Sequence, residues 1–156
     1  MKKKILIVLL VLFIGIQFIR AEENTGPADT AQDISHFVQV PGPVMNVLKT
    51  SCYDCHSNHT RYPWYSKINP VGMWLNNHIA EGKDEINFSD FSKYNIKRLD
   101  HKLEEIAEEV QEEHMPLPAY TFLHTDAQLT EDQTRLLIDW VKTERQKLNV
   151  SGKESK

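Results

Sequence analysis

The chain has 156 residues, of which 18 are Lys or Arg and 22 are Asp or Glu, and its formal net charge is −4. This length suggests one domain with terminal extensions. Four of the basic residues precede position 21, so the rest of the chain holds 14 basic against 22 acidic residues. This balance argues against nucleic acid as a partner, because its binders need a basic patch to displace counterions.

The N-terminus has the basic and then apolar pattern of an export signal. Residues 1–4 read Met-Lys-Lys-Lys, and an apolar run follows at 5–19. As a helix this run reaches about 22 Å, short of the roughly 30 Å hydrocarbon core, which fits a cleaved signal peptide. Residues 18–23 offer no clear cleavage site, which favours an uncleaved anchor. We assign residues 1–21 to a signal peptide or N-terminal membrane anchor, and both readings place the rest of the chain outside the cytoplasm.

The next segment is polar, and a short helix follows it. Residues 22–40 have the mixed polar composition of a linker. From Pro43, which suits a first helical turn, apolar residues at helical spacing predict a helix that runs into Cys52. We place the folded domain at residues 41–147 and a polar tail at 148–156.

The chain's two cysteines lie three apart in Cys52-Tyr53-Asp54-Cys55-His56, a C-x-x-C-H motif that is the attachment signature of c-type haem. Residues three apart at a helix end share one face, so both thiols can reach the vinyl groups along one haem edge. His56 then supplies the proximal iron ligand.

A disulfide, a zinc site and a redox dithiol each fit the cysteine pair less well than haem attachment does. A disulfide closing so short a loop would stabilise the fold little. A structural zinc site needs four ligands, and there is no second cysteine pair. A redox dithiol of the thioredoxin kind would sit in alternating strands and helices, which the sequence does not show.

Helical patterns continue after the motif. Residues 58–69 are an aromatic loop, 70–81 predict a helix stopped by Gly82, and 87–92 are a connection. An amphipathic helix is predicted where apolar residues recur at steps of three and four, at Ile96, Leu99, Leu103, Ile106 and Val110.

The C-terminal part of the chain predicts one further helix. We expect Pro116 to end the amphipathic helix, whose glutamates form a solvated outer face. Thr130 and Gln133 form a capping box at the start of the last helix, and its apolar residues lie on one side. No run alternates apolar and polar residues, so the predicted fold class is all-α.

Met115 is the leading candidate for the sixth iron ligand. It precedes Pro116, a position that favours extended backbone, so its side chain can turn inward. A thioether opposite His56 makes a six-coordinate electron-transfer centre of raised potential. The alternative role for Met115 is to fill a gap in the core. The rival ligands are His114, His78 and Met73.

The haem motif, the later Met115-Pro116 pair and the C-terminal Leu137-x-x-Trp140-Val141 helix together resemble class I cytochromes c. More closely, the chain is similar to small bacterial haem-binding domain proteins, which are cytochrome-c-like modules preceded by an N-terminal hydrophobic segment. The likeness covers about residues 40–147, and the segment from 62 to 91 is longer than in a minimal cytochrome c.

The resemblance implies a helical domain wrapped around one covalently attached haem c. It implies contact between the first and last helices of the domain, through Val44, Val47, Leu48, Leu137, Trp140 and Val141. It also implies that the backbone carbonyl of Pro70 accepts the second ring N–H of His56.

Three functions compete. An electron carrier is favoured, and a sensor or binding module in which Met115 dissociates is the second. A haem peroxidase needs an open iron position, a distal base and a cationic group. His78 or His114 could be the base and Arg61 or Arg98 the cationic group, but their spacing in the sequence does not support this reading. We therefore predict a non-enzymatic carrier with redox protein partners in the cell envelope and no small-molecule substrate. We expect it to be exported, to the periplasm or the outer face of the cytoplasmic membrane.

Overall fold

The computed structural model describes residues 1–27 and 30–154, with side chains described as far as residue 149. Within these residues every regular element is a helix or a short 3₁₀ turn, apart from one isolated bridge between Thr25 and His59. The predicted all-α class is confirmed.

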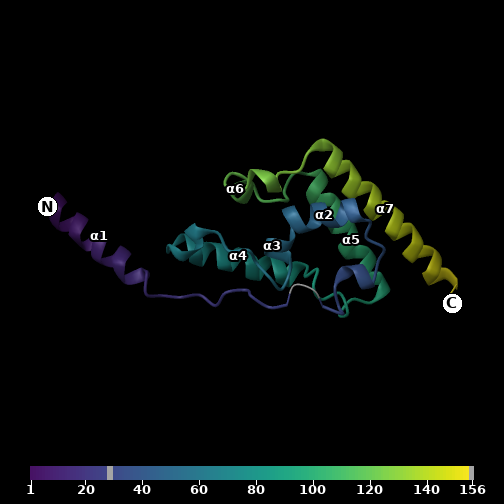
Figure 1. Cartoon of the computed structure of the whole chain (residues 1–156), viewed down its shortest axis with the longest axis horizontal. Helices are drawn as coiled ribbons and strands as arrows, with labels where there is room; N and C mark the ends of the chain where they lie inside the picture. Colours follow the sequence, from purple (N-terminus) through teal and green to yellow (C-terminus); the bar gives the residue numbers. More distant parts are fainter. Residues whose placement is uncertain (28–29, 155–156) are drawn as a thin grey trace.

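The helices follow one another along the chain as Figure 1 shows. Their bounds are α1 Lys2–Ile16, α2 Gly42–Ser51, α3 Tyr53–His56, α4 Val71–Glu85, α5 Ile96–Gln111, α6 Pro118–Thr121 and α7 Glu131–Glu154. The 3₁₀ turns are η1 Ile34–His36, η2 Trp64–Lys67 and η3 Thr125–Ala127.

The core lies where α2, α5 and α7 meet (Figure 1). One buried cluster contains all six residues expected to join the first and last helices, namely Val44, Val47, Leu48, Leu137, Trp140 and Val141. At the edge of this contact Arg145 of α7 binds both carboxylate oxygens of Asp100, at 2.9 and 3.2 Å, and Glu104 at 2.7 Å. Apolar packing and this ion-pair cluster together hold α7 on α5.

Local capping signals set the helix ends. The Asn95 side chain accepts the backbone N–H of Arg98 at 2.9 Å and begins α5. The predicted capping box of α7 is present, because Thr130 and Gln133 exchange hydrogen bonds of 2.9 and 3.2 Å. The end of α5 comes earlier than expected, at Gln111 rather than beside Pro116.

The segment predicted as a linker is part of the domain. Ile34 is fully buried, and its N–H donates to the carbonyl of Phe88 at 2.8 Å. The Asn24 side-chain amide donates to the carbonyl of Ser57 at 2.9 Å. The interpretation of residues 22–40 as a free linker is therefore wrong, because these side chains find their partners far along the chain.

The polar tail also begins later than expected. Helix α7 continues to Glu154, and Leu148 packs against the core. Positions 28–29 of the expected linker and 155–156 of the expected tail lie outside the described residues.

The N-terminal helix α1 extends away from the rest of the molecule (Figure 1). Its apolar side chains from Ile5 to Ile14 are between 47% and 68% exposed. In the part of the chain that the structure describes, no helix combines the length and apolar character needed to cross a membrane.

Candidate functional site

The C-x-x-C-H motif begins with Cys52 at the C-terminal cap of α2 and continues as the one-turn helix α3. Cys52 closes α2 with a 2.9 Å hydrogen bond from its N–H to the Leu48 carbonyl, and its own carbonyl accepts the N–H of His56 at 2.9 Å. This turn brings Cys52, Cys55 and His56 to the wall of one cavity with a volume of about 710 Å³. The predicted grouping of these three residues is thus present in the structure.

Further parts of the chain border this cavity. They include α4, α5, the loop after α5 and α6, which contribute His78, Glu81, Gly82, Glu85, His101, Lys102, Glu105, Ile106, Glu108, Glu109, Val110, Met115, Pro116, Leu117 and Tyr120. The glutamate face of α5 is therefore not only an outer surface, because part of it borders the cavity.

The imidazole of His56 is held by two backbone carbonyls. Its Nδ1 lies 2.8 Å from the Gly82 oxygen and 3.1 Å from the Ile86 oxygen. Since a carbonyl can only accept, Nδ1 carries the proton, and Nε2 keeps the lone pair that a metal ion needs. Burial lowers the pKa of His56, which favours the neutral, ligating form.

The expected contact between His56 and Pro70 is wrong in this structure. The Pro70 carbonyl instead accepts the N–H of Trp74, at 3.0 Å, in the first turn of α4. His56 meets the other end of this helix, at Gly82. The resemblance therefore placed the carbonyl partner on the right helix but at the wrong end.

Gly82 does not stop α4 as the sequence predicted; it allows the helix to pack closely against the motif. It lies inside α4, which continues to Glu85. A Cβ atom at this position would stand 3.1 Å from the Cys55 oxygen and 3.2 Å from Cε1 of His56. The missing side chain lets α4 approach the motif closely enough for the carbonyl to reach Nδ1.

Both thiols hold their protons strongly. Burial, and then the neighbouring Cys55, raises the pKa of Cys52 to about 12. Burial, and then Asp54, raises the pKa of Cys55 to about 11. Redox dithiols depend on a thiolate of lowered pKa, so this environment does not suit that alternative.

The candidate sixth ligands occupy different places. Met115 and His78 both border the cavity, whereas His114 and Met73 do not. The His114 ring is 61% exposed and lies 3.3 Å from a Glu112 oxygen. The side chain of Met115 is half-buried, and its N–H donates to the Glu109 carbonyl at 3.1 Å in the turn that ends α5.

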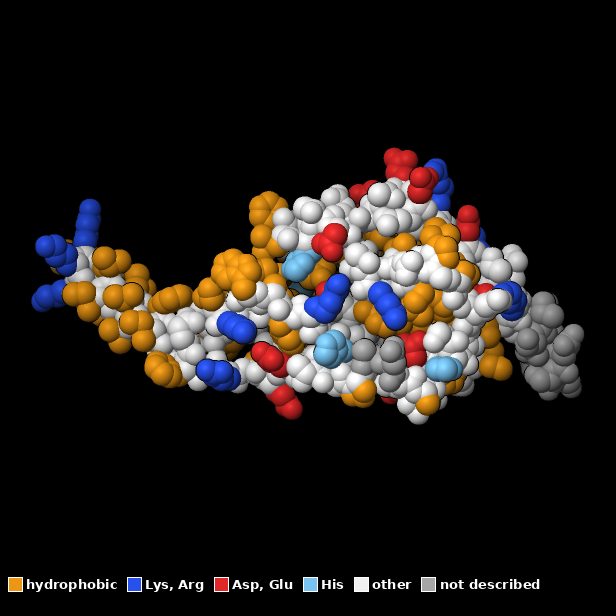
Figure 2. All heavy atoms as spheres, in the orientation of Figure 1, with side chains coloured by type: hydrophobic (Ala, Val, Ile, Leu, Met, Phe, Trp, Pro, Cys, Tyr) orange, Lys and Arg blue, Asp and Glu red, His pale blue; other side chains and the backbone are white. Residues whose placement is uncertain are grey.

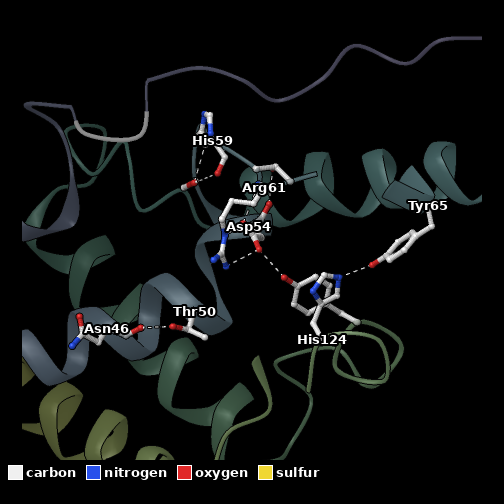
Figure 3. A network of polar contacts seen from close by, with 10 residues as sticks. Asn46, Thr50, Asp54, His59, Arg61, Tyr65 and His124 are labelled. Carbon is white, nitrogen blue, oxygen red and sulfur yellow. Dashed lines mark hydrogen bonds and ion pairs between the residues drawn. The ribbon is translucent and has the colours of Figure 1, made fainter. Parts of the chain in front are cut away.

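A buried carboxylate inside the motif links it to α6, the helix that follows the Met115 loop. Asp54 accepts Nε and Nη2 of Arg61 at 3.1 and 3.0 Å, as Figure 3 shows. The Tyr120 hydroxyl donates to the same carboxylate at 2.7 Å. Burial, and then this hydrogen bond, raises the pKa of Tyr120.

The Tyr120 ring also stacks on His124 at 4.3 Å, and the Tyr65 hydroxyl lies 2.6 Å from Nε2 of His124. Figure 3 shows Tyr65 and His124 pointing toward one another from different segments. No sequence pattern singled out Tyr120 or His124 as members of this cluster. The only sequence signal was the acidic residue inside the motif.

The residues present suit a flat cofactor that brings its own metal. The cavity volume of about 710 Å³ lies within the usual range for ligand sites. Two thiols stand beside a neutral imidazole whose orientation is fixed, and a thioether borders the same space. This set of groups matches what a covalently held haem requires.

Comparison with known proteins points the same way. A family model described as a haem-binding domain matches residues 11–143 of the chain. No curated relative and no solved structure was found to match it.

Proposed function

The chain belongs to the haem-binding domain family, and from this premise we propose that it is a single-haem c-type cytochrome that carries electrons between redox proteins of the cell envelope. One observation carries the proposal: the thiols of Cys52 and Cys55 and the imidazole of His56 border the same cavity as Met115.

Different residues would hold different parts of the cofactor. Cys52 and Cys55 would hold the porphyrin through thioether bonds, and Nε2 of His56 would bind the iron. The iron of a bound haem supplies reversible one-electron transfer. The carbonyls of Gly82 and Ile86 keep the His56 ring in one tautomer and one orientation, which strengthens it as a ligand.

We propose Met115 as the sixth ligand because its thioether borders the same cavity as the thiols and the imidazole of the motif. A thioether stabilises ferrous iron and raises the potential. His78 also borders the cavity, and its Nδ1 lies 2.9 Å from the Trp74 carbonyl while its ring packs on the Trp74 ring at 4.2 Å. The contact through Nδ1 leaves Nε2 of His78 able to bind iron, as in His56, so His78 stays the rival sixth ligand.

The surroundings of the arginines favour a carrier over a peroxidase. Arg61 is bound to Asp54, and Arg98 lies over the Tyr94 ring at 5.5 Å. Neither borders the cavity. The cationic group that peroxide cleavage needs is therefore not supplied by the two candidates.

We propose that the protein works outside the cytoplasm, in the periplasm or at the outer face of the cytoplasmic membrane. The basic residues 2–4 at the start of α1 and the apolar residues that follow them in this helix support this placement.

The test is to express the full chain with a haem-attachment system and compare it with Met115→Ala. We expect wild type to retain haem after denaturation and to show the weak far-red thioether–ferric band, which Met115→Ala should lose. Met73→Ala is the matched control, because Met73 is 38% exposed and does not border the cavity. It should leave the spectrum unchanged.

Two results would contradict the proposal. A denatured protein without haem would show that the attachment is not covalent. A Met115→Ala spectrum identical to wild type, with rapid carbon monoxide binding by both reduced proteins, would indicate an open iron and favour a sensor.

A further inference from the structure

Several segments of this acidic chain contain no carboxylate, among them residues 34–53. Three more are residues 1–21, 61–80 and 114–125. These three segments carry six basic residues, Lys2, Lys3, Lys4, Arg20, Arg61 and Lys67. The rest of the chain is correspondingly more acidic.

The fold brings these segments together at one end of the molecule. Asn69 is tied to the end of α1, because its N–H donates to Oε1 of Gln17 at 3.0 Å and its amide donates to the carbonyl of Ile19 at 2.6 Å. The contact of 2.6 Å between Tyr65 and His124 joins η2 to the segment after α6. We call residues 61–75 and 117–124, together with residues 1–20, the acid-free end.

Large apolar side chains are exposed on this end. Trp64 is 77% exposed and Phe122 is 81% exposed. Around them lie Ile68, Val71, Met73, Trp74 and Leu123, each between 38% and 58% exposed. Figure 2 shows hydrophobic side chains along α1 and on the part of the domain that faces it. Several large apolar side chains exposed at one end of a protein mark an interaction site.

We propose that the acid-free end docks the domain on an anionic lipid bilayer. Exposed tryptophans are typical of the interface between water and lipid. Anionic headgroups attract Lys67 and Arg20, and the segments 61–75 and 117–124 contain no carboxylate of their own. The Asp54 carboxylate, which contacts Arg61 and Tyr120 there, is buried and paired. The inference rests on the proposed placement of the protein at a membrane and extends it from α1 to the domain itself.

The apolar surface of the domain lies next to the apolar helix α1, and this favours a lipid bilayer over a protein as the partner. The hydrogen bonds of Asn69 place the domain surface next to the exposed apolar helix α1. A bilayer surface can receive both at once. Because Met115 and Tyr120 border the cavity and belong to the segment 114–125, docking here fixes the orientation of the haem cavity relative to the bilayer.

The test uses the full haem-loaded chain in nanodiscs of phosphatidylcholine and phosphatidylglycerol that contain a photoactivatable phospholipid. After irradiation, lipid adducts are mapped by mass spectrometry. We expect adducts within residues 61–75 and 117–124 as well as 1–20, and none on α5. The double variant Trp64→Ser, Phe122→Ser should lose most domain adducts and keep those on residues 1–20. Ile96→Ser is the matched control, since Ile96 is 53% exposed on α5, and it should match wild type.

Adducts confined to residues 1–20, or spread evenly over α5 and α7, would overturn the inference. So would a double variant that labels like wild type. The absorption spectrum of the same sample reports the haem separately. Missing haem with the expected adducts would refute the proposed function alone, and intact haem without domain adducts would refute this inference alone.

Discussion

At the scale of single residues, the site depends on contacts that leave little freedom to His56. Its ring packs against the backbone of α4, and two carbonyls of that region face one nitrogen. Asp54, between the two cysteines, collects donors from Arg61 and Tyr120. Substitutions that add or remove a single atom at these positions should therefore change the free energy of unfolding measurably.

Replacing Gly82 with Ala should lower stability, although Gly to Ala within a helix normally adds about 1 kcal/mol. The new Cβ would stand 3.1 Å from the Cys55 oxygen and 3.2 Å from the His56 ring. We expect a net loss of about 1–2 kcal/mol from this overpacking. Denaturant unfolding of the haem-loaded protein measures it. Gly42→Ala is the control, because a Cβ added there would have open space for 4 Å around it; equal effects at both sites would refute the argument.

Replacing Tyr120 with Phe should cost about 1.5–3 kcal/mol, the usual range for a hydrogen bond to a charged group. The lost bond is the 2.7 Å contact with Asp54. Tyr94→Phe is the matched control, because the Tyr94 hydroxyl is buried and has no hydrogen-bond partner among the described residues. This control should be neutral or stabilising in thermal and urea unfolding. Equal losses in both variants would show that the Asp54 bond contributes nothing specific.

At the scale of secondary-structure elements, the last helix joins the two sides of the core. Helix α7 packs on α2 through buried apolar side chains and on α5 through apolar contacts and the ion pairs of Arg145. The loop after α5 is held differently, by the turn at Met115 and by Tyr120. The core and the cavity wall thus rely on different kinds of contact.

Two adjacent leucines of α7 provide a direct measure of this packing. Leu137 is fully buried, whereas Leu136 is 36% exposed. We expect Leu137→Ala to lower the free energy of unfolding by about 2–5 kcal/mol, because it leaves a cavity in the core. Leu136→Ala should cost about 1 kcal/mol or less. Urea unfolding followed by circular dichroism compares them, and similar losses would mean that α7 does not pack as described.

At the scale of the whole molecule, charge is separated from apolar surface. The segments 61–75 and 117–124 contain no carboxylate and are contacted by the buried Asp54, whereas several other carboxylates border the cavity along α4 and α5. Lys102, with 9% of its side chain exposed, lies among them and binds Glu105 at 2.6 Å. The cavity therefore lies between an acidic wall and the acid-free end.

The buried cysteines should make the stability of the haem-free chain depend on alkaline pH. Unfolded thiols lose their protons near pH 9.0, whereas the folded pKa values are about 12 and 11. Above pH 9.0 the unfolded chain therefore binds fewer protons, so stability should fall as the pH rises from 9.0 toward 11. Urea midpoints across this range measure the fall. The double variant Cys52→Ser, Cys55→Ser should show a weaker slope, and an equal slope would contradict the role given to the thiols.

The sequence by itself determined the features that depend on neighbours along the chain. The amphipathic spacing of α5, the Thr130–Gln133 capping box and the C-x-x-C-H turn all follow from contacts between residues three or four apart. The placement of Cys52, Cys55 and His56 together is of this kind. For that reason the helical class and the candidate cofactor site could be predicted before the fold was known.

Only the tertiary structure decided which distant groups meet. It replaced Pro70 with Gly82 and Ile86 as partners of His56, folded Asn24 and Ile34 onto the domain, and separated Met115 and His78 from the other candidate ligands. It also joined the acid-free segments through Asn69 and the Tyr65–His124 contact. The physical reason is that such contacts depend on how whole helices pack, and packing is set by the shape of the complete core and not by local spacing.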